Sequence, residues 1–311
     1  MKTNPIRLAF CLFKPMHGAL RPAGVALLGL AAAMMPAGAL ADANTAKTNF
    51  FANMKQASVT FPDVNASTAT MVPAQVKGLY GIYSPKGNLI SVTNEAGTLT
   101  GKAGGFSSVR LQPGKPRPMS PQQVAGLRAE IMANIDYDKL IKTSYGNGGG
   151  RKILMFSALD CPGCNQLEKA LHKAAPTLNT TFYIVPGSLR DSSAGGMPWL
   201  EKVARIRCDD NAGQAWQTYW TKRTLPAARA CALTPERVEL DNYLMSHIMD
   251  GIKVMKPIYP MLVSEDGKWL PLPRGMTSAS ISAVFGPESK PAAIQAPVQW
   301  LAAAPAAGTS K

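Results

Sequence analysis

The residues best suited to chemistry are two cysteines separated by two residues, Cys161 and Cys164, in the sequence Cys-Pro-Gly-Cys. A helix starting at this motif would give the first sulfur unpaired backbone amides and the positive end of the helix dipole, which favour thiolate over thiol. Cys161 is therefore the expected nucleophile toward a substrate disulfide, exposed at the helix start. Cys164, one turn deeper, is expected to resolve the mixed disulfide. Pro162 suits the first turn because it lacks an amide hydrogen that would go unpaired there.

The elements around the motif place it at such a helix start. Residues 152–158 form a continuous apolar run typical of a buried strand. An apolar stripe at helical spacing follows the motif and stops before Pro176, and residues 180–186 have the pattern of the next strand. This order predicts a β-α-β unit with both cysteines at the helix start, a context that favours redox chemistry.

Two other interpretations of the pair are a zinc site and an inert structural disulfide. Structural zinc sites commonly use two close pairs of ligands or added histidines. The chain has one close pair, and neither His172 nor His247 shows ligand spacing with it. We therefore expect no metal and no cofactor.

The other cysteines have a different pattern. Cys11 falls in the N-terminal signal, which leaves four cysteines in the mature chain, an even number. Cys208 and Cys231 are well separated within a segment, residues 187–252, that is mostly helical in pattern. They are expected to form a structural disulfide contributing about 3 kcal/mol. The alternative is a second redox relay, but no second helix-start motif is present.

Pro260 is the remaining residue of interest. It directly precedes a short apolar strand, and the bulky Tyr259 comes before it. Pro260 is either a strand-edge breaker or, in a thioredoxin-like domain, a cis proline facing the two cysteines. Pro257 is the nearby competitor.

The rest of the chain divides around this region. Residues 50–105 show alternating strands and turns, about 55 residues with a thin core, and Ser120 and Gln123 form a capping box that begins a helix. After Pro260, a strand, a turn and a second short strand precede a terminal helix at 277–285. We expect an α+β fold with these parts: a signal peptide at 1–41, an N-terminal antiparallel β domain at 42–118, a linker helix at 119–149, a domain with the two cysteines and a helical insertion at 150–285, and a disordered Ala/Pro-rich tail at 286–311.

The N-terminus predicts export. Basic residues precede an apolar run, and Ala39, Leu40 and Ala41 make a small-x-small cleavage site. The alternative is a retained membrane anchor, although Gly, Ala and Pro make the run a weak span. The formal net charge of the 311-residue chain is +14, but its Lys and Arg residues are scattered, so we expect a solvated basic surface and no nucleic-acid partner.

The sequence resembles the DsbC/DsbG family of periplasmic disulfide isomerases over nearly all of the predicted mature chain. The resemblance is strongest in residues 156–167 around the two cysteines, in the separated pair Cys208 and Cys231, and in residues 259–263. Residues 76–80 and 87–90 resemble that family's dimerisation domain. The resemblance therefore implies a dimerisation domain at 42–118 and a thioredoxin-like catalytic domain at 150–285.

The resemblance implies a periplasmic, V-shaped homodimer that corrects disulfides in misoxidised exported proteins, held reduced by a membrane electron donor of the DsbD type. It implies that Cys161 is the nucleophile, Cys164 the resolving cysteine and Pro260 the cis proline. Tyr259, Pro162 and Gly163 are expected to contact the client, and Cys208 with Cys231 matches a structural disulfide.

The sequence differs from the family in several places, which include a longer segment before Pro260 and an unmatched Ala/Pro tail. Tyr259 replaces a small threonine, Gly163 replaces an aromatic residue, and Asp160 puts a negative charge that opposes thiolate formation beside Cys161. Isomerase, reductase and oxidase activity are all compatible with these residues. The alternative is a chaperone-like or envelope-assembly binding module that uses the same fold with little turnover.

Overall fold

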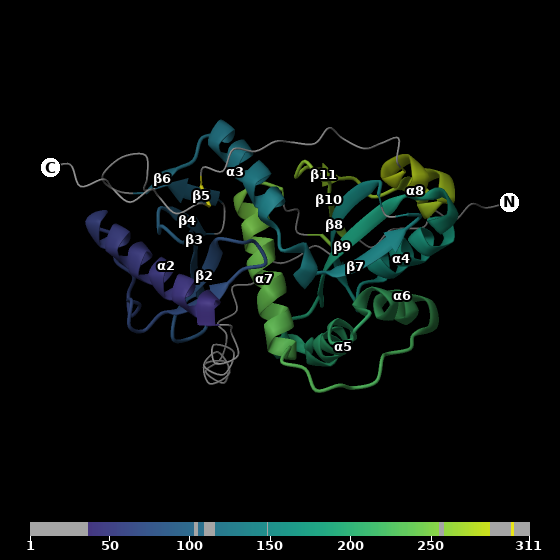
Figure 1. Cartoon of the computed structure of the whole chain (residues 1–311), viewed down its shortest axis with the longest axis horizontal. Coiled ribbons are helices and arrows are strands. Elements are labelled where there is room, and N and C mark those ends of the chain that lie inside the picture. The colour runs from purple at the N-terminus through teal and green to yellow at the C-terminus, as the bar shows by residue number, and fades with distance from the viewer. Residues whose placement is uncertain are drawn as a thin grey trace. The chain divides into compact units, whose positions relative to one another are not determined.

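The computed structural model describes residues 37–102, 105–108, 116–147, 149–254, 258–286 and 300–301. The fold is mixed α/β, with two sheets in two compact units (Figure 1). The cysteine unit takes its described residues from Tyr137–Asn242 and Lys256–Ala293. The six-stranded unit takes them from His17–Asp136, Tyr243–Met255 and Ile294–Lys311.

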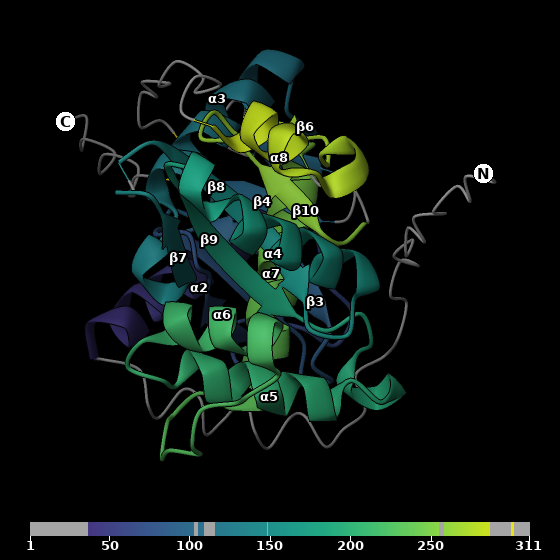
Figure 2. The ribbon, with the colours of Figure 1, turned by 90° about the vertical axis from the view of Figure 1, so that its right-hand side faces the viewer.

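The cysteine unit is built on a five-stranded sheet of order β11-β10-β8-β9-β7 (Figure 2). Strands β8 and β9 are parallel, and the other neighbouring strands are antiparallel. Helix α4 (Pro162–Ala174) connects β8 to β9, so the β-α-β unit predicted around the cysteines is present. This arrangement is consistent with a thioredoxin-like fold. The strands are β7 (Ile141–Tyr145), β8 (Arg151–Ala158), β9 (Thr180–Gly187), β10 (Met261–Val263) and β11 (Trp269–Leu270).

Burial explains why β8 and α4 form where the sequence predicts. Residues 153–158 are all buried, as a central strand covered on both faces requires. The predicted apolar stripe of α4 is also buried, and the helix contacts α6 (Ala212–Lys222) and α8 (Ser278–Phe285). The stripe consists of Leu167, Ala170, Leu171 and Ala174.

The segment between β9 and β10 is mostly helical, as its pattern indicates. It contains α5 (Met197–Arg207), α6 and α7 (Pro235–Gly251), and α7 contributes residues to both units. Cys208 caps α5 and forms a disulfide with Cys231, 23 residues later in an exposed stretch without regular structure. The disulfide closes a loop for which chain entropy predicts a stabilisation of about 3 kcal/mol. Short 3-10 turns complete the unit at Tyr137–Lys139, Ala175–Thr177, Ser192–Ala194 and Arg274–Met276.

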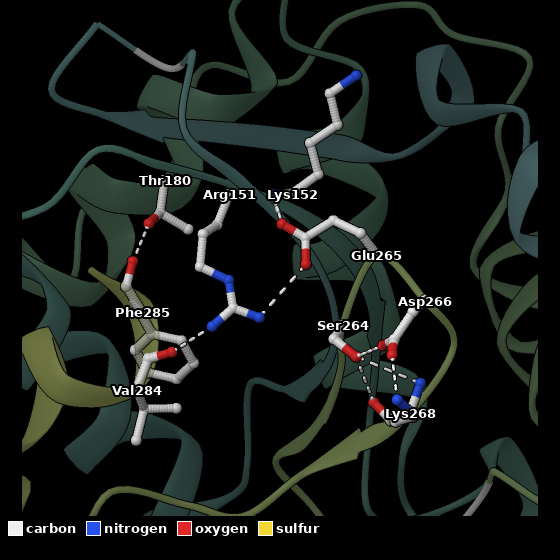
Figure 3. A network of polar contacts seen from close by, with 9 residues as sticks. All are labelled: Arg151, Lys152, Thr180, Ser264, Glu265, Asp266, Lys268, Val284 and Phe285. Atoms are coloured by element: carbon white, nitrogen blue, oxygen red, sulfur yellow. Dashed lines mark hydrogen bonds and ion pairs between the residues drawn. The ribbon is translucent and has the colours of Figure 1, made fainter. Parts of the chain in front are cut away.

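A polar network fixes the beginning of β8 (Figure 3). The buried Arg151 side chain donates to Glu265 at 3.3 Å and to the carbonyl of Val284, and Glu265 also accepts the backbone N–H of Lys152 at 2.6 Å. Thr180 donates to the carbonyl of Phe285. These bonds join β8 and β9 to the turn after β10 and to the end of α8. The network therefore fixes the strand whose other end leads into the cysteines.

The six-stranded unit carries an antiparallel sheet in the order β1-β2-β3-β4-β5-β6. The turn predicted after β2 is present: Ser84 and Asn88 are joined by a 2.9 Å backbone hydrogen bond, and Gly87 has φ 78°, which glycine adopts without strain. The strands are β1 (Thr70–Pro73), β2 (Leu79–Tyr83), β3 (Leu89–Asn94), β4 (Leu99–Lys102), β5 (Gly105–Ser108) and β6 (Arg117–Pro118).

Helix α2 (Ala37–Gln56) is a feature that the sequence reasoning missed, because residues 42–49 were expected to be a polar lead-in. One face of α2 is buried and packs against β1, β2 and β3. This face shares a core with Met71, Tyr80 and Ile82. The expectation of a thin core in this region is therefore wrong, because α2 supplies the missing apolar surface. The buried face consists of Ala43, Ala46, Phe50 and Met54.

The predicted linker helix is shorter than expected. Helix α3 (Pro121–Asn134) begins with the predicted capping box of Ser120 and Gln123, but the chain then forms β7 within residues 119–149. The sheet of the cysteine unit therefore includes chain before residue 150. β7 alternates buried and exposed residues, as an edge strand with one covered face does.

The two ends of the chain are described only in part. Residues 1–36 of the predicted signal lie outside the described residues, and residues 37–41 begin α2. Of the predicted disordered tail, residues 287–299 and 302–311 lie outside the described residues, whereas Trp300 and Leu301 are buried in the six-stranded unit. Within the described ranges, we find no helix with the length and apolar character needed to cross a membrane.

Candidate functional site

Cys161 is the N-cap of helix α4. The turn after β8 leaves this residue extended, with φ −92° and ψ 118°, and its Sγ accepts the backbone N–H of Cys164 at 3.2 Å. The sulfur therefore occupies the position in which a serine or aspartate oxygen would cap a helix. On its other side, Sγ is 3.6 Å from the backbone carbonyl oxygen of Tyr259.

This position lowers the pKa of the Cys161 thiol. The largest cause is a hydrogen bond from the Cys164 thiol, and the backbone amides of Cys164 and Gly163 act in the same direction. Burial opposes them, and the negative charge of Asp160 opposes them least. Asp160 accepts hydrogen bonds from Ser188 Oγ at 2.9 Å and from the backbone N–H of Leu189 at 2.8 Å. The charge that the sequence marked as unfavourable is therefore outweighed by the helix start.

Cys164 behaves in the opposite way. Burial raises the pKa of its thiol well above the ordinary value, and the neighbouring Cys161 sulfur raises it further by holding the shared proton on Cys164. The backbone N–H of Ala158 donates to Cys164 Sγ at 3.4 Å and offsets part of this effect. The pair is thus divided into a thiol that ionises readily and a thiol that retains its proton.

The expectation that Cys161 is exposed is wrong. Its residue exposure is 2%, compared with 0% for Cys164, and both are free thiols in the structure. The segment that covers Cys161 includes Tyr259 and Pro260, whose peptide bond is cis. A Cβ atom added to Gly163 would be 3.4 Å from Pro260 Cδ and 3.9 Å from Cys161 Sγ. The Cys161 sulfur is thus enclosed between the start of α4 and the segment that carries Tyr259 and Pro260.

The side chain of Tyr259 points into the protein and is not available for contact with a client. It is buried, and its phenol donates to Asn242 Oδ1 at 2.9 Å. Asn242 in turn donates to the carbonyl of Pro186 at 3.1 Å. Gly187 leaves room for this amide, because a Cβ there would be 2.6 Å from Asn242 Nδ2. The large side chain thus anchors the segment from within, while the backbone carbonyl of Tyr259 faces the nucleophile.

The sequence reasoning missed Glu168. This residue lies one helical turn after Cys164 on the buried face of α4, and Trp216 Nε1 donates to its Oε1 at 2.8 Å. Burial raises the pKa of the Glu168 carboxyl to about 8. A carboxyl with this pKa exchanges protons near neutral pH.

Ser157 lies between these two groups. Its Oγ is buried without a well-formed hydrogen bond among the described residues, yet its hydroxyl lowers the pKa of both the Cys164 thiol and the Glu168 carboxyl. A hydroxyl can rotate toward either neighbour. Ser157 thus acts electrostatically on both the Cys164 thiol and the Glu168 carboxyl.

The structure brings Cys161, Pro162, Gly163, Cys164, Tyr259 and Pro260 to one place, the start of α4 and the segment before β10. Cys208 and Cys231 are joined to each other and not to this pair. Among the described residues, no three His, Cys, Asp or Glu side chains are arranged to hold a metal ion. The arrangement is suited to thiol–disulfide exchange by two sulfurs of unequal acidity.

Replacing Glu168 by Gln should change how stability depends on pH. Because folding raises the pKa of this carboxyl, the folded protein holds a proton that the unfolded chain loses above its ordinary pKa. The free energy of unfolding of the wild type, relative to Glu168→Gln, should therefore fall by on the order of 4 kcal/mol as pH rises from about 5 to about 8. Urea titrations across this range measure it.

The control is Glu201→Gln, which changes an exposed carboxylate on α5 and should leave the pH dependence of the wild type unaltered. Parallel curves for the wild type and Glu168→Gln would show that the carboxyl is ionised in the folded protein.

No protein-family model and no curated protein matches the chain. Among solved structures, it is similar to a disulfide interchange protein from Neisseria gonorrhoeae. The two are 23% identical, with a TM-score of 0.37, over 50% of this chain and 99% of the other. A likeness this distant cannot assign a function, so any assignment depends on the geometry of the site itself.

Proposed function

We propose that the chain is an exported thiol:disulfide oxidoreductase with Cys161 as nucleophile and Cys164 as resolving residue. The observation that carries the proposal is the Cys161 sulfur at the N-cap of α4, with its pKa lowered while that of Cys164 is raised. A thiolate is the attacking species in disulfide exchange, and a buried second thiol supplies the resolving step.

The reaction proceeds in two exchanges. The Cys161 thiolate attacks one sulfur of a client disulfide, which forms a mixed disulfide and releases the other client sulfur as a thiolate. In one outcome, that client thiolate attacks a different client disulfide and expels a second client thiolate. The second thiolate attacks the client sulfur of the mixed disulfide and releases the Cys161 thiolate, so the client is isomerised without net oxidation. In the other, Cys164 loses its proton and attacks Cys161 Sγ. The client is then reduced by two electrons, and a Cys161–Cys164 disulfide forms.

We assign the protein to disulfide isomerisation and reduction in misoxidised exported proteins. Isomerisation requires the pair to be reduced at the start, and every completed reduction leaves it oxidised. A membrane electron donor of the DsbD type would restore the two thiols. Pro162 and Gly163, which follow Cys161 at the start of α4, are the residues that we propose contact the client. The backbone of Tyr259 offers a carbonyl 3.6 Å from Cys161 Sγ.

Removal of each active-site sulfur should give a different result. Cys161→Ser should abolish insulin reduction, because the attacking sulfur is lost. Cys164→Ser should accumulate mixed disulfides with clients, visible on non-reducing gels, because nothing resolves them. The double variant Cys208→Ser with Cys231→Ser is the control and should retain exchange at moderate temperature. Accumulation in Cys161→Ser instead would reverse the two roles.

We propose that the mature protein is a homodimer joined through the six-stranded unit. Strands β1 and β6 stand at the two ends of its sheet order, and an edge strand can pair with a second copy. Two catalytic domains on a shared base would hold a client while its disulfide bonds are broken and re-formed, because bivalent contact raises the effective concentration of the client at each active site.

A dilution series of the full mature chain tests the dimer without any substitution. Sedimentation measures the concentration at which the dimer dissociates. Below that concentration, the rate of scrambled-ribonuclease refolding per chain should fall at least severalfold, while the rate of insulin reduction per chain stays constant. A chain that is monomeric at every concentration, or equal dilution dependence of both activities, would contradict the dimer.

We further propose a periplasmic protein whose signal is cleaved after Ala41. Cleavage at that position would retain the buried face of α2 from Ala43 onward. N-terminal sequencing of the exported form should begin at Asp42. A membrane-bound form that retains Met1 would show that the apolar run serves as an anchor.

A further inference from the structure

Glu130 is a fully buried carboxylate on α3, far along the chain from the cysteine pair. An ionised carboxylate can be buried only where hydrogen-bond donors replace the water that it loses. Among the described residues, the donors to this carboxylate come from two adjacent backbone amides. The N–H of Trp300 is 2.8 Å from Oε2 and 3.1 Å from Oε1, and the N–H of Leu301 is 2.7 Å from Oε1.

The carbonyl of the same dipeptide is also bound. Asn94 Nδ2 donates to the carbonyl oxygen of Trp300 at 2.7 Å, and Asn94 Oδ1 accepts the backbone N–H groups of Thr98 at 2.9 Å and Leu99 at 3.0 Å. The turn between β3 and β4 therefore fixes the orientation of the Asn94 amide. Two N–H groups and one carbonyl of the dipeptide are thus matched by two buried side chains.

Glycines allow the dipeptide to approach closely. A Cβ atom on Gly78 would be 3.1 Å from the carbonyl oxygen of Leu301, and one on Gly126 would be 3.9 Å from Trp300 Nε1. Gly126 precedes Glu130 by one turn of α3, so both mark the same face of the helix. The side chains of Trp300 and Leu301 are buried in the same unit.

We propose that these residues form a peptide-binding site and that the dipeptide Trp300–Leu301 is its resident ligand. The polar contacts are made to the main chain, which every peptide carries, and the burial of Trp300 and Leu301 suits a large aromatic residue followed by an aliphatic one. The ligand class is an extended apolar segment of an unfolded polypeptide. The chain's own tail holds the site until such a segment displaces it.

This inference is independent of the proposed redox chemistry, because no cysteine takes part in it. Covalent tethering gives the resident dipeptide a high effective concentration, so a free peptide competes only when it is abundant. Glu130 requires backbone N–H groups, so a peptide lacking the second N–H should not compete.

Hydrogen exchange on the full mature chain tests the proposal. The probe is a synthetic peptide of residues 298–304, Val-Gln-Trp-Leu-Ala-Ala-Ala, and the control peptide is N-methylated at its leucine. In the wild type, the amides of Trp300 and Leu301 should exchange at least tenfold more slowly than in an unstructured peptide. Millimolar probe should accelerate their exchange severalfold, and the control peptide should not.

Two variants of the full chain complete the test. Trp300→Gly with Leu301→Pro empties the site and removes one amide, so fluorescein-labelled probe should bind this variant at least tenfold more tightly than the wild type. Ala306→Gly with Ala307→Pro makes the same changes further along the tail and should bind as the wild type does. The proposal would be overturned if the amides of Trp300 and Leu301 exchanged in the wild type as fast as in an unstructured peptide, or if both peptides accelerated their exchange equally. It would also be overturned if the Trp300→Gly, Leu301→Pro variant folded but did not bind the probe.

Discussion

The contact between the backbone N–H of Cys164 and Cys161 Sγ, 3.2 Å long, is the interaction on which the site depends. It makes a cysteine the cap of its own helix, so the sulfur receives the unpaired amides that begin α4. The same turn buries Cys164 one step deeper, where ionisation is unfavourable. The helix start therefore brings together a thiol whose pKa is lowered, chiefly by a hydrogen bond from its partner thiol and further by backbone amides, and a partner whose pKa is raised, chiefly by burial.

The rest of the cysteine unit holds this turn in place from several directions. The Arg151 network fixes the beginning of β8, and the buried stripe of α4 fixes the helix that follows. Tyr259 anchors the opposing segment through Asn242. Rigidity has a consequence for function, because the nucleophile is covered. Cys161 is buried beside the segment that includes Tyr259 and Pro260.

Much of this site could be predicted from the sequence because its signals are local. A strand, two cysteines and a helical stripe follow one another, and the turn after Pro260 is equally local. Glu168 could not be identified in this way. Its charge within the apolar face of α4 has meaning only once Trp216, from a different helix, is known to cover it. Helix α2 was missed because residues 42–49 are largely polar, and the burial of Ala43, Ala46, Phe50 and Met54 depends on strands that lie later in the chain. The burial of Trp300 depends on Glu130, a contact between residues 170 positions apart that composition cannot reveal.

The most direct test of the central claim is the rate of iodoacetamide alkylation of each cysteine as a function of pH, measured on the reduced wild type by mass spectrometry. Alkylation of Cys161 should follow a pKa below the free-thiol value of about 8.5, while Cys164 should react only at higher pH. The assignment would be contradicted if Cys161 titrated at or above the free-thiol value, or if Cys164 reacted first.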